Sequence, residues 1–193
     1  MVAAPDFAAE PVSDDARLVA RWIVRNADNL GLPFAIVDKR HTRLYVFAPN
    51  GRLSGASAVL VGLAPGDEAV ADMAHRTVAS LAPQERTTPA GRYGTEPGHN
   101  DKGEAIVWFD YDASLAIHRL RAGPSAERRE ERLASAEAAS RRASYGCVVV
   151  PVAFYEAIVA PSLGQRRGIV YVLPEARPVA LMFGAIEGDS TAP

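Results

Sequence analysis

Ser144-Tyr145-Gly146-Cys147-Val148-Val149-Val150 is a turn-like segment followed by a β-branched run typical of a buried strand. Its cysteine is the only one among 193 residues, so the chain has no internal disulfide. The thiol is therefore inert in the core, reactive, or available for a bond to another molecule. Gly146, directly before the cysteine, would allow a second backbone or a substrate to approach closely.

A reactive cysteine needs a base, because the thiolate and not the thiol is the nucleophile. Only one of the four histidines, His118, ends an apolar strand-like run, Leu115-Ala116-Ile117-His118, that could hold it rigidly beside another strand. The pattern indicates Cys147 as the nucleophile, His118 as its base, and the amides of Gly146 and Cys147 as donors to an oxyanion. A structural cysteine beside a histidine satisfied by packing is the alternative.

Strand-like runs dominate the rest of the chain. They cover residues 34–37, 44–47, 58–61, 106–109, 115–117, 147–150 and 168–173, with 179–183 as a further candidate. Asn50-Gly51 predicts a tight turn. Residues 63–83 are interpreted as loop with some helix, and residues 87–103 as turn and loop.

Helices are predicted in three places: after an N-cap at Ser13, over residues 126–142, and after Pro151. Repeats of 20 to 50 residues are absent from the sequence. The pattern predicts a mainly β protein with a few helices (α+β) in a single domain.

Composition excludes several classes of protein. Apolar residues make up 48% of the chain, enough for a packed core, and a net charge of −2 argues against a nucleic-acid-binding protein. No run is long enough for a transmembrane segment, and the first residues lack the regions of a signal peptide. This leaves a cytosolic protein or one whose signal peptide has been removed. Neither metal nor cofactor is expected, because no zinc-type spacing or phosphate-binding glycine loop is found.

Three blocks in the same order resemble the YkuD-type catalytic domain of L,D-transpeptidases. They are Thr88-Pro89-Ala90-Gly91-Arg92-Tyr93, Ile117-His118-Arg119 and Ser144-Tyr145-Gly146-Cys147, which match the family's Thr-Pro-x-Gly-x-aromatic segment, upstream histidine and Ser/Thr-His-Gly-Cys block. The resemblance implies a YkuD-like β-sandwich or barrel over residues 34–184. Residues 1–33 would then pack on that domain as an N-terminal segment and helix, and residues 185–193 would form a flexible tail.

The resemblance also implies roles for individual residues. Cys147 would attack the acyl donor, His118 would deprotonate it, and the backbone carbonyl of Arg119 would hold the imidazole. Ser144 would pack or hydrogen-bond at the start of the block. The expected oxyanion and substrate-binding residues are Gly146, Ser144, Tyr145, Arg142 and Tyr93.

The chain departs from the family pattern in three ways. Tyr145 replaces the usual histidine of the block, and Val149 stands where arginine or asparagine is common. His118 and Cys147 are 29 positions apart, which indicates an insertion over the charged residues 125–142. The charged stretch is interpreted mainly as a solvated helix face, with Arg142 best placed to bind a substrate carboxylate. Tyr93 and Trp108 could line a pocket or belong to the core.

The function implied by the resemblance is that of a peptidoglycan L,D-transpeptidase of the bacterial periplasm or another extracytoplasmic compartment. Cys147 would attack a stem tetrapeptide after its third residue, release D-Ala and form a thioester. An amine on a second stem peptide, or on a lipoprotein, would resolve it. The alternatives are an L,D-carboxypeptidase or crosslink hydrolase of the same fold, or a non-catalytic cell-wall-binding scaffold.

Overall fold

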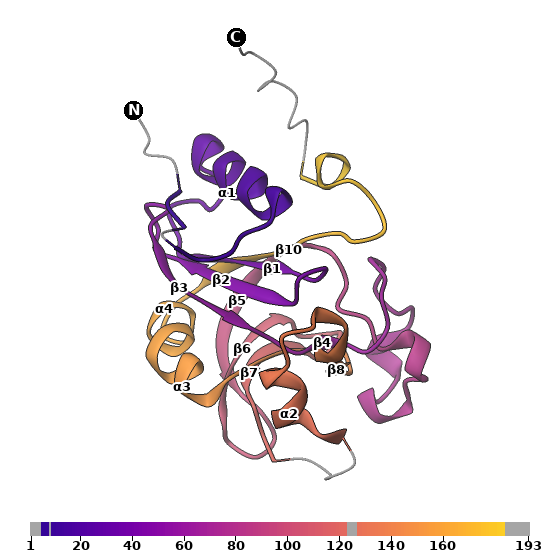
Figure 1. Cartoon of the computed structure of the whole chain (residues 1–193). Helices are drawn as coiled ribbons and strands as arrows, with labels where there is room; N and C mark the ends of the chain where they lie inside the picture. The colour runs from indigo at the N-terminus through magenta and orange to yellow at the C-terminus, as the bar shows by residue number, and fades with distance from the viewer. Residues whose placement is uncertain (1–4, 8, 123–126, 184–193) are drawn as a thin grey trace.

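The computed structural model of the chain describes residues 5–7, 9–122 and 127–183, so the predicted tail 185–193 lies outside the described residues. One eight-stranded sheet forms its centre, in the order β3-β2-β1-β10-β5-β6-β7-β9 (Figure 1). The strands are β1 (Phe34–Asp38), β2 (Arg43–Phe47), β3 (Leu53–Ala58), β5 (Gly91–His99), β6 (Ala105–Asp110), β7 (Leu115–Arg119), β9 (Val148–Val150) and β10 (Gly168–Val172). A small second sheet pairs β4 (Val61–Gly62) with β8 (Arg142–Ser144).

The large sheet closes on itself. Directly after β3, Leu60 and Val149 of β9 exchange two backbone hydrogen bonds of 2.8 and 2.9 Å. This pair joins the two ends of the strand order, so the sheet forms a nearly closed barrel. The prediction of a mainly β single domain is confirmed.

The interior of the barrel holds the larger apolar core. Alternate residues of the strands point inward, among them Val107, Ile117 and Val148. A helical run over residues 152–163 adds Tyr155, Val159 and Leu163 to this core. The run consists of α3 (Val152–Phe154), a π-helical turn (Tyr155–Val159) and α4 (Ala160–Leu163). The helix predicted after Pro151 is therefore present.

Helix α1 (Asp14–Asn26) covers the outer face of β1, β2 and β10 (Figure 1). Its first turn is built as predicted: the Ser13 hydroxyl accepts a hydrogen bond of 3.1 Å from the Ala16 amide, with Asp14 and Asp15 beside it. The buried face of α1 packs into a second apolar cluster with strand residues such as Phe34 and Tyr171. One outer side of the barrel is therefore closed to solvent.

Two segments differ from the strand predictions for a common reason. The strand expected at residues 58–61 is only partly present, because Ala58 ends β3 and Val61 begins β4, while β3 itself starts at Leu53 and pairs with β2 across the turn at Asn50-Gly51. Residues 87–103 were expected to be loop, but residues 91–99 form β5, which is paired on both sides by β10 and β6. In both cases pairing with neighbours outweighs the weak strand propensity of small residues.

Two further segments differ in type from the prediction. Residues 179–183, a candidate strand, contain a short 3-10 helix (Val179–Leu181). The expected long helix over residues 126–142 is reduced to α2 (Arg129–Ala134) and a 3-10 turn (Ala138–Arg141). Part of this segment folds back instead, because Arg132 donates to the carbonyls of Ser140 and Arg142 at 3.2 and 3.4 Å.

Candidate active site

The turn that carries the cysteine is held by Ser144. Its hydroxyl donates to the Cys147 carbonyl at 2.6 Å and accepts the Gly146 amide at 3.0 Å. Gly146 has a φ of +136°, and a Cβ atom there would lie 2.7 Å from the Thr87 carbonyl oxygen, so only glycine fits. Because the Gly146 amide is already bonded to Ser144, the Cys147 amide is the better candidate to bind an oxyanion.

Thr88 anchors the same turn from a distant segment. Its buried hydroxyl donates to the Gly146 carbonyl at 2.8 Å and accepts the Gly62 amide at 2.9 Å. This bond gives a physical reason for the Thr-Pro block noted in the sequence. The block is linked directly to the backbone that presents the cysteine.

His118 lies on β7, where its ring is oriented by the next residue. Its Nδ1 atom lies 2.8 Å from the carbonyl oxygen of Arg119. A carbonyl can only accept a hydrogen bond, so Nδ1 carries the proton and Nε2 of the neutral ring keeps a free lone pair. The contact between His118 and Arg119 has the geometry that the family resemblance implies.

Burial keeps this imidazole neutral. His118 is 7% exposed, and burial lowers its pKa to about 4. The hydrogen bond to the Arg119 carbonyl opposes the shift, whereas the positive charges of Arg121 and Arg129 add to it. At neutral pH the ring is therefore an unprotonated base.

The strand register places the histidine and the cysteine on one face of the sheet. β7 and β9 are parallel, with Ile117 beside Val148 and His118 beside Val149. Ile117 and Val148 point into the barrel, so the alternation of side chains places His118 outside, together with Cys147 one residue before β9. The charges of Arg121 and Arg129 act on both side chains.

Cys147 is a residue of intermediate exposure, and its Sγ atom lies 3.5 Å from the Ser114 carbonyl oxygen. Burial raises its pKa, while the Ala116 amide and the charges of Arg121 and Arg129 lower it in part. At neutral pH the two candidates are consequently a thiol and a neutral imidazole, and not a thiolate and an imidazolium.

Sequence reasoning missed two charged residues of this site. Arg121 follows β7 and lies 2.5 Å (Nε to Oε2) from Glu104, while Arg129 begins α2 and pairs with Glu127. Arg129 had been counted only as part of the charged stretch. The position of Arg121, three residues after His118 at a strand end, was the available signal.

Arg142 is not free for a substrate carboxylate, contrary to expectation. Its guanidinium pairs with Glu175 and approaches the carbonyls of Lys39 and Gly62 at 3.3 and 3.4 Å. Glu175 in turn accepts the Gly66 amide at 2.8 Å. The arginine joins a partly buried charge cluster that holds the chain together.

The two predicted tyrosines occupy different surroundings. Tyr93 packs against the interior core with its ring 5.4 Å from that of Phe109, which favours the core interpretation. Tyr145 lies under Arg86, whose guanidinium is 4.1 Å from the ring centroid. Tyr145 is thus fixed beside the cysteine turn by a neighbour that the sequence did not suggest.

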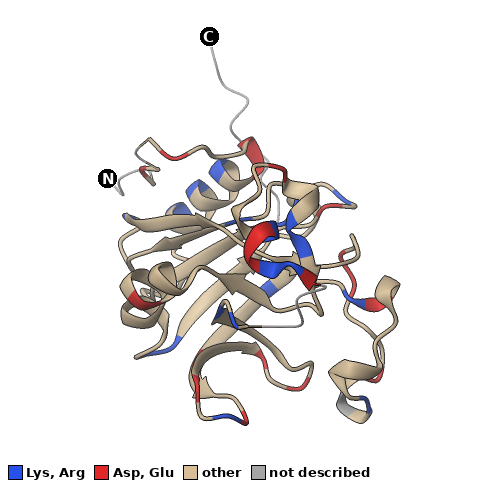
Figure 2. Ribbon diagram, turned by 60° about the horizontal axis from the view of Figure 1, so that its bottom comes forward, with Lys and Arg blue, Asp and Glu red and all other residues tan. Residues whose placement is uncertain are grey.

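The remaining departure, Val149, has a structural explanation. It is buried against Leu60 and Leu133, so the seam of the barrel is covered by the inserted segment. Charges of both signs gather on the outside of α2, where Arg128 pairs with Glu131 (Figure 2). The interpretation of a solvated charged face holds for this part of the insertion.

Within the described ranges, no three histidine, cysteine or acidic side chains gather as a metal site would require. In the same part of the chain, no helix combines the length and the apolar character needed to cross a bilayer.

No protein-family model and no curated protein match the chain. In structure it is similar to the avibactam carbamoyl enzyme of Ldtfm, at 15% identity and a TM-score of 0.43 over 74% of this chain and 49% of that chain. It is also similar to the catalytic domain of the E. faecium L,D-transpeptidase, at 16% identity and a TM-score of 0.40 over 73% of this chain and 96% of that chain. The match spans about half the length of the first structure. Similarities this low do not transfer an activity, so function has to be argued from the site.

Proposed function

We propose that the protein is a cysteine acyltransferase of the L,D-transpeptidase type that acts on peptidoglycan stem tetrapeptides outside the bacterial cytoplasm. One observation carries the proposal: a neutral imidazole, with its Nδ1 proton fixed on the Arg119 carbonyl, lies on the strand next to the one that Cys147 directly precedes, and this cysteine is of intermediate exposure. The match of three sequence blocks to the family supports the choice of substrate.

In the first half-reaction, Nε2 of His118 takes the proton of the Cys147 thiol as the sulfur bonds to the carbonyl carbon of the third residue of the stem peptide. The negative charge that forms on the carbonyl oxygen would be met by the Cys147 amide. When the intermediate collapses, the imidazolium returns its proton to the nitrogen of D-Ala. The products are free D-Ala and a thioester on Cys147.

In the second half-reaction, His118 deprotonates an incoming amine, which attacks the thioester carbonyl. The new amide bond releases the sulfur, which recovers the proton from His118. The amine would come from a second stem peptide or from a lipoprotein. If water instead of an amine attacks the thioester, the protein is an L,D-carboxypeptidase or a crosslink hydrolase. Both alternatives form the same acyl-enzyme.

The test uses a carbapenem, which acylates a cysteine nucleophile irreversibly. The full chain should gain the mass of one carbapenem, and Cys147→Ala should gain none. His118→Gln should react at least 100-fold more slowly because it removes the base, whereas His99→Gln, an exposed histidine at the end of β5, should react like the parent.

Folded protein without an adduct would contradict the proposal and favour the non-catalytic scaffold. Once an adduct is found, the products formed from a disaccharide tetrapeptide show whether the acceptor is an amine or water. A crosslinked dimer indicates transfer, and a tripeptide with free D-Ala indicates hydrolysis.

A further inference from the structure

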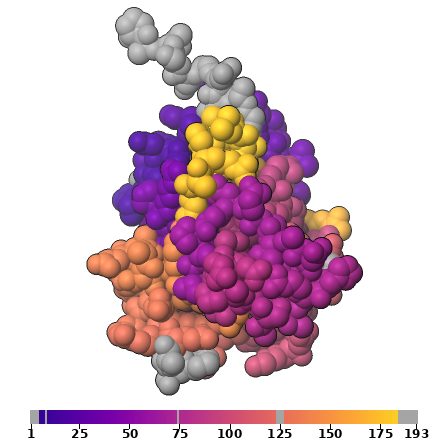
Figure 3. Space-filling view, turned by 90° about the vertical axis from the view of Figure 1, so that its right-hand side faces the viewer, coloured from indigo at the N-terminus to yellow at the C-terminus, as the bar shows by residue number. Residues whose placement is uncertain are grey.

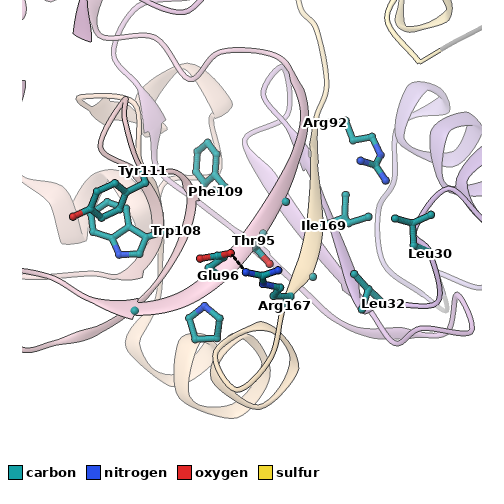
Figure 4. A pocket seen from close by; sticks show the side chains of 14 residues that line it. Leu30, Leu32, Arg92, Thr95, Glu96, Trp108, Phe109, Tyr111, Arg167 and Ile169 are labelled. Carbon is teal, nitrogen blue, oxygen red and sulfur yellow. Dashed lines mark ion pairs between the residues drawn. The ribbon is translucent and has the colours of Figure 1, made fainter. Parts of the chain in front are cut away.

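The outer face of the barrel is covered on two sides and open between them. Helix α1 covers β1, β2 and β10, and Leu120, Leu133 and Ala143 pack over Val149 of β9. Between these covers, the outer faces of β5 and β6 border a hollow of about 570 Å³ (Figure 4). Its lining includes Arg92, Gly94, Glu96, Gly98, Trp108 and Tyr111.

A row of paired residues connects this hollow with the cysteine. Glu96 of β5 lies beside Trp108 of β6, and Trp108 lies beside Ala116 of β7. The pairing of Ile117 with Val148 places Ala116 level with Cys147, the residue directly before β9. The backbones of Trp108 and Cys147 are therefore two strand spacings, or about 10 Å, apart.

The chemistry of the hollow suits a sugar ring. Trp108 and Tyr111 form an aromatic wall with ring centroids 5.1 Å apart, and Tyr111 is 73% exposed. The floor is open backbone at Gly94, where a Cβ atom would meet nothing within 4 Å, and the Trp108 ring lies directly over Gly98. Such a wall can stack on the apolar face of a pyranose, while the hydroxyl groups of the sugar remain in contact with water and polar groups.

The charges at the rim are paired with one another. Glu96 bonds Arg167 at 2.6 Å, as Figure 4 shows, and Arg92 bonds Asp28 at 2.6 Å. These planar groups can hydrogen-bond hydroxyls and amides, but they offer no excess charge to an ionic ligand. An extended peptide is disfavoured as the occupant, because β5 and β6 are each paired on both sides and cannot accept an added strand.

We propose that this hollow binds a hexose of the glycan strand whose stem peptide reaches Cys147, with Trp108 and Tyr111 stacking on the ring. The inference rests on the proposed function for the identity of the glycan. Three extended residues span about 10 Å, which matches the two strand spacings between Trp108 and the cysteine. A sugar at Trp108 would therefore place the bond after the third residue at the thiol.

A binding experiment tests the site without catalysis. Cys147→Ala protein is titrated with peptide-free oligomers of N-acetylglucosamine, and binding is followed by calorimetry. The oligomers should bind, and adding Trp108→Ala or Gly94→Leu should weaken binding about tenfold or more. Gly94→Leu fills the hollow from a position with open space, so its effect does not depend on a packing defect. Leu181→Ala, an exposed apolar residue elsewhere, should leave binding unchanged.

A second readout compares donors on the active enzyme. The ratio of kcat/KM for a disaccharide tetrapeptide to that for the free tetrapeptide should be about ten and should fall towards one in both hollow variants. No oligomer binding, or equal use of both donors, would overturn the inference while leaving the acyl-enzyme intact. An equal loss of kcat/KM for both donors in Gly94→Leu would indicate that the hollow binds the stem peptide and not the sugar. Oligomer binding by a protein that forms no acyl-enzyme would overturn only the proposed function.

Discussion

At the scale of single residues, the catalytic candidates owe their protonation states to position. Burial acts on His118 and Cys147 in the same direction, towards the uncharged form of each. Arg121 and Arg129 then favour a negative sulfur and disfavour a positive ring. The surroundings therefore favour negative charge at this site and disfavour a thiolate–imidazolium pair.

The reactivity of the thiol should follow this arrangement. Iodoacetamide should alkylate Cys147 slowly at pH 7, at a rate that rises up to a pKa above the ordinary cysteine value of about 8.5. Arg121→Gln and Arg129→Gln should each raise that pKa further, because each removes a positive charge near the sulfur. Arg128→Gln, on the exposed side of α2, is the matched control. A rate already at its plateau at pH 7 would contradict a neutral resting pair.

Stability should depend on pH through His118. Its folded pKa of about 4 lies below the unfolded value of about 6.5, so the unfolded state binds the proton first as the pH falls. The free energy of unfolding is therefore unaffected by this group above pH 6.5. It decreases by about 3 kcal/mol as the pH falls from 6.5 to 4. Urea unfolding of the parent and of His118→Gln at pH 7 and pH 4.5 isolates this contribution. Equal losses in both proteins would show that the histidine titrates normally.

The sequence was sufficient to predict Gly146 and Cys147 at the junction of a turn and a strand, and His118 near the end of another strand. Each of these residues belongs to a local pattern. The sequence could not place Arg121, whose role depends on where the chain goes after β7. Nor could it show that Arg142 is occupied by Glu175, since these residues meet only in the folded chain. Local chemistry was predictable here, and partners distant in sequence were not.

At the scale of elements, the cysteine turn depends on a second segment. The loop before β5 supplies Thr88, whose hydroxyl satisfies the Gly146 carbonyl and the Gly62 amide. The turn is thus clamped between β4 and the approach to β5. Its geometry is set by elements that carry none of the reacting atoms.

Thr88→Val should show this clamp. The change keeps the shape but leaves a buried carbonyl and a buried amide unpaired, at a cost of about 1–3 kcal/mol in the free energy of unfolding. It should also slow carbapenem acylation, because the turn is no longer held. Thr87→Val is the control, since the Thr87 hydroxyl bonds the Glu68 carbonyl at an exposed position and should contribute within about 0.5 kcal/mol. Equal effects of the two variants would contradict the role assigned to Thr88.

Strand β5 shows why elements were only partly predictable. It contains three glycines and a proline, and its exposed alternate residues give it the appearance of a loop. Most other strands carry β-branched or aromatic runs and were found from sequence. A strand whose stability comes from two neighbours cannot be recognised from its own residues.

At the scale of the whole molecule, a charge cluster joins segments that are far apart in sequence. The ammonium of Lys39, after β1, is 1% exposed and lies 3.0 Å from Asp67 and 2.9 Å from the Thr88 carbonyl oxygen. The amides of Glu175 and Ala176 donate to Asp67 and help to keep its pKa low despite burial. Figure 3 shows the segment after β10 lying along the loop around residue 67.

Breaking this cluster should destabilise the entire fold. Lys39→Met removes one buried charge and leaves the buried carboxylate of Asp67 without the ammonium beside it, which should cost about 3–5 kcal/mol in the free energy of unfolding. Arg128→Gln removes an exposed ion pair with Glu131, away from this cluster, and should change the free energy of unfolding only slightly. Denaturant unfolding of both variants measures the difference. A loss below 1 kcal/mol for Lys39→Met would show that the cluster is not a stabilising centre.

The seam between Leu60 and Val149 has a consequence for behaviour in concentrated solution. A sheet whose last strand is bonded back to the chain beyond its first strand offers few free amides to a neighbouring molecule along that seam. Strand pairing between two molecules along this seam would first require the barrel to open. The same two bonds that hold the strand after Cys147 in place thus also protect the protein against self-association along this seam.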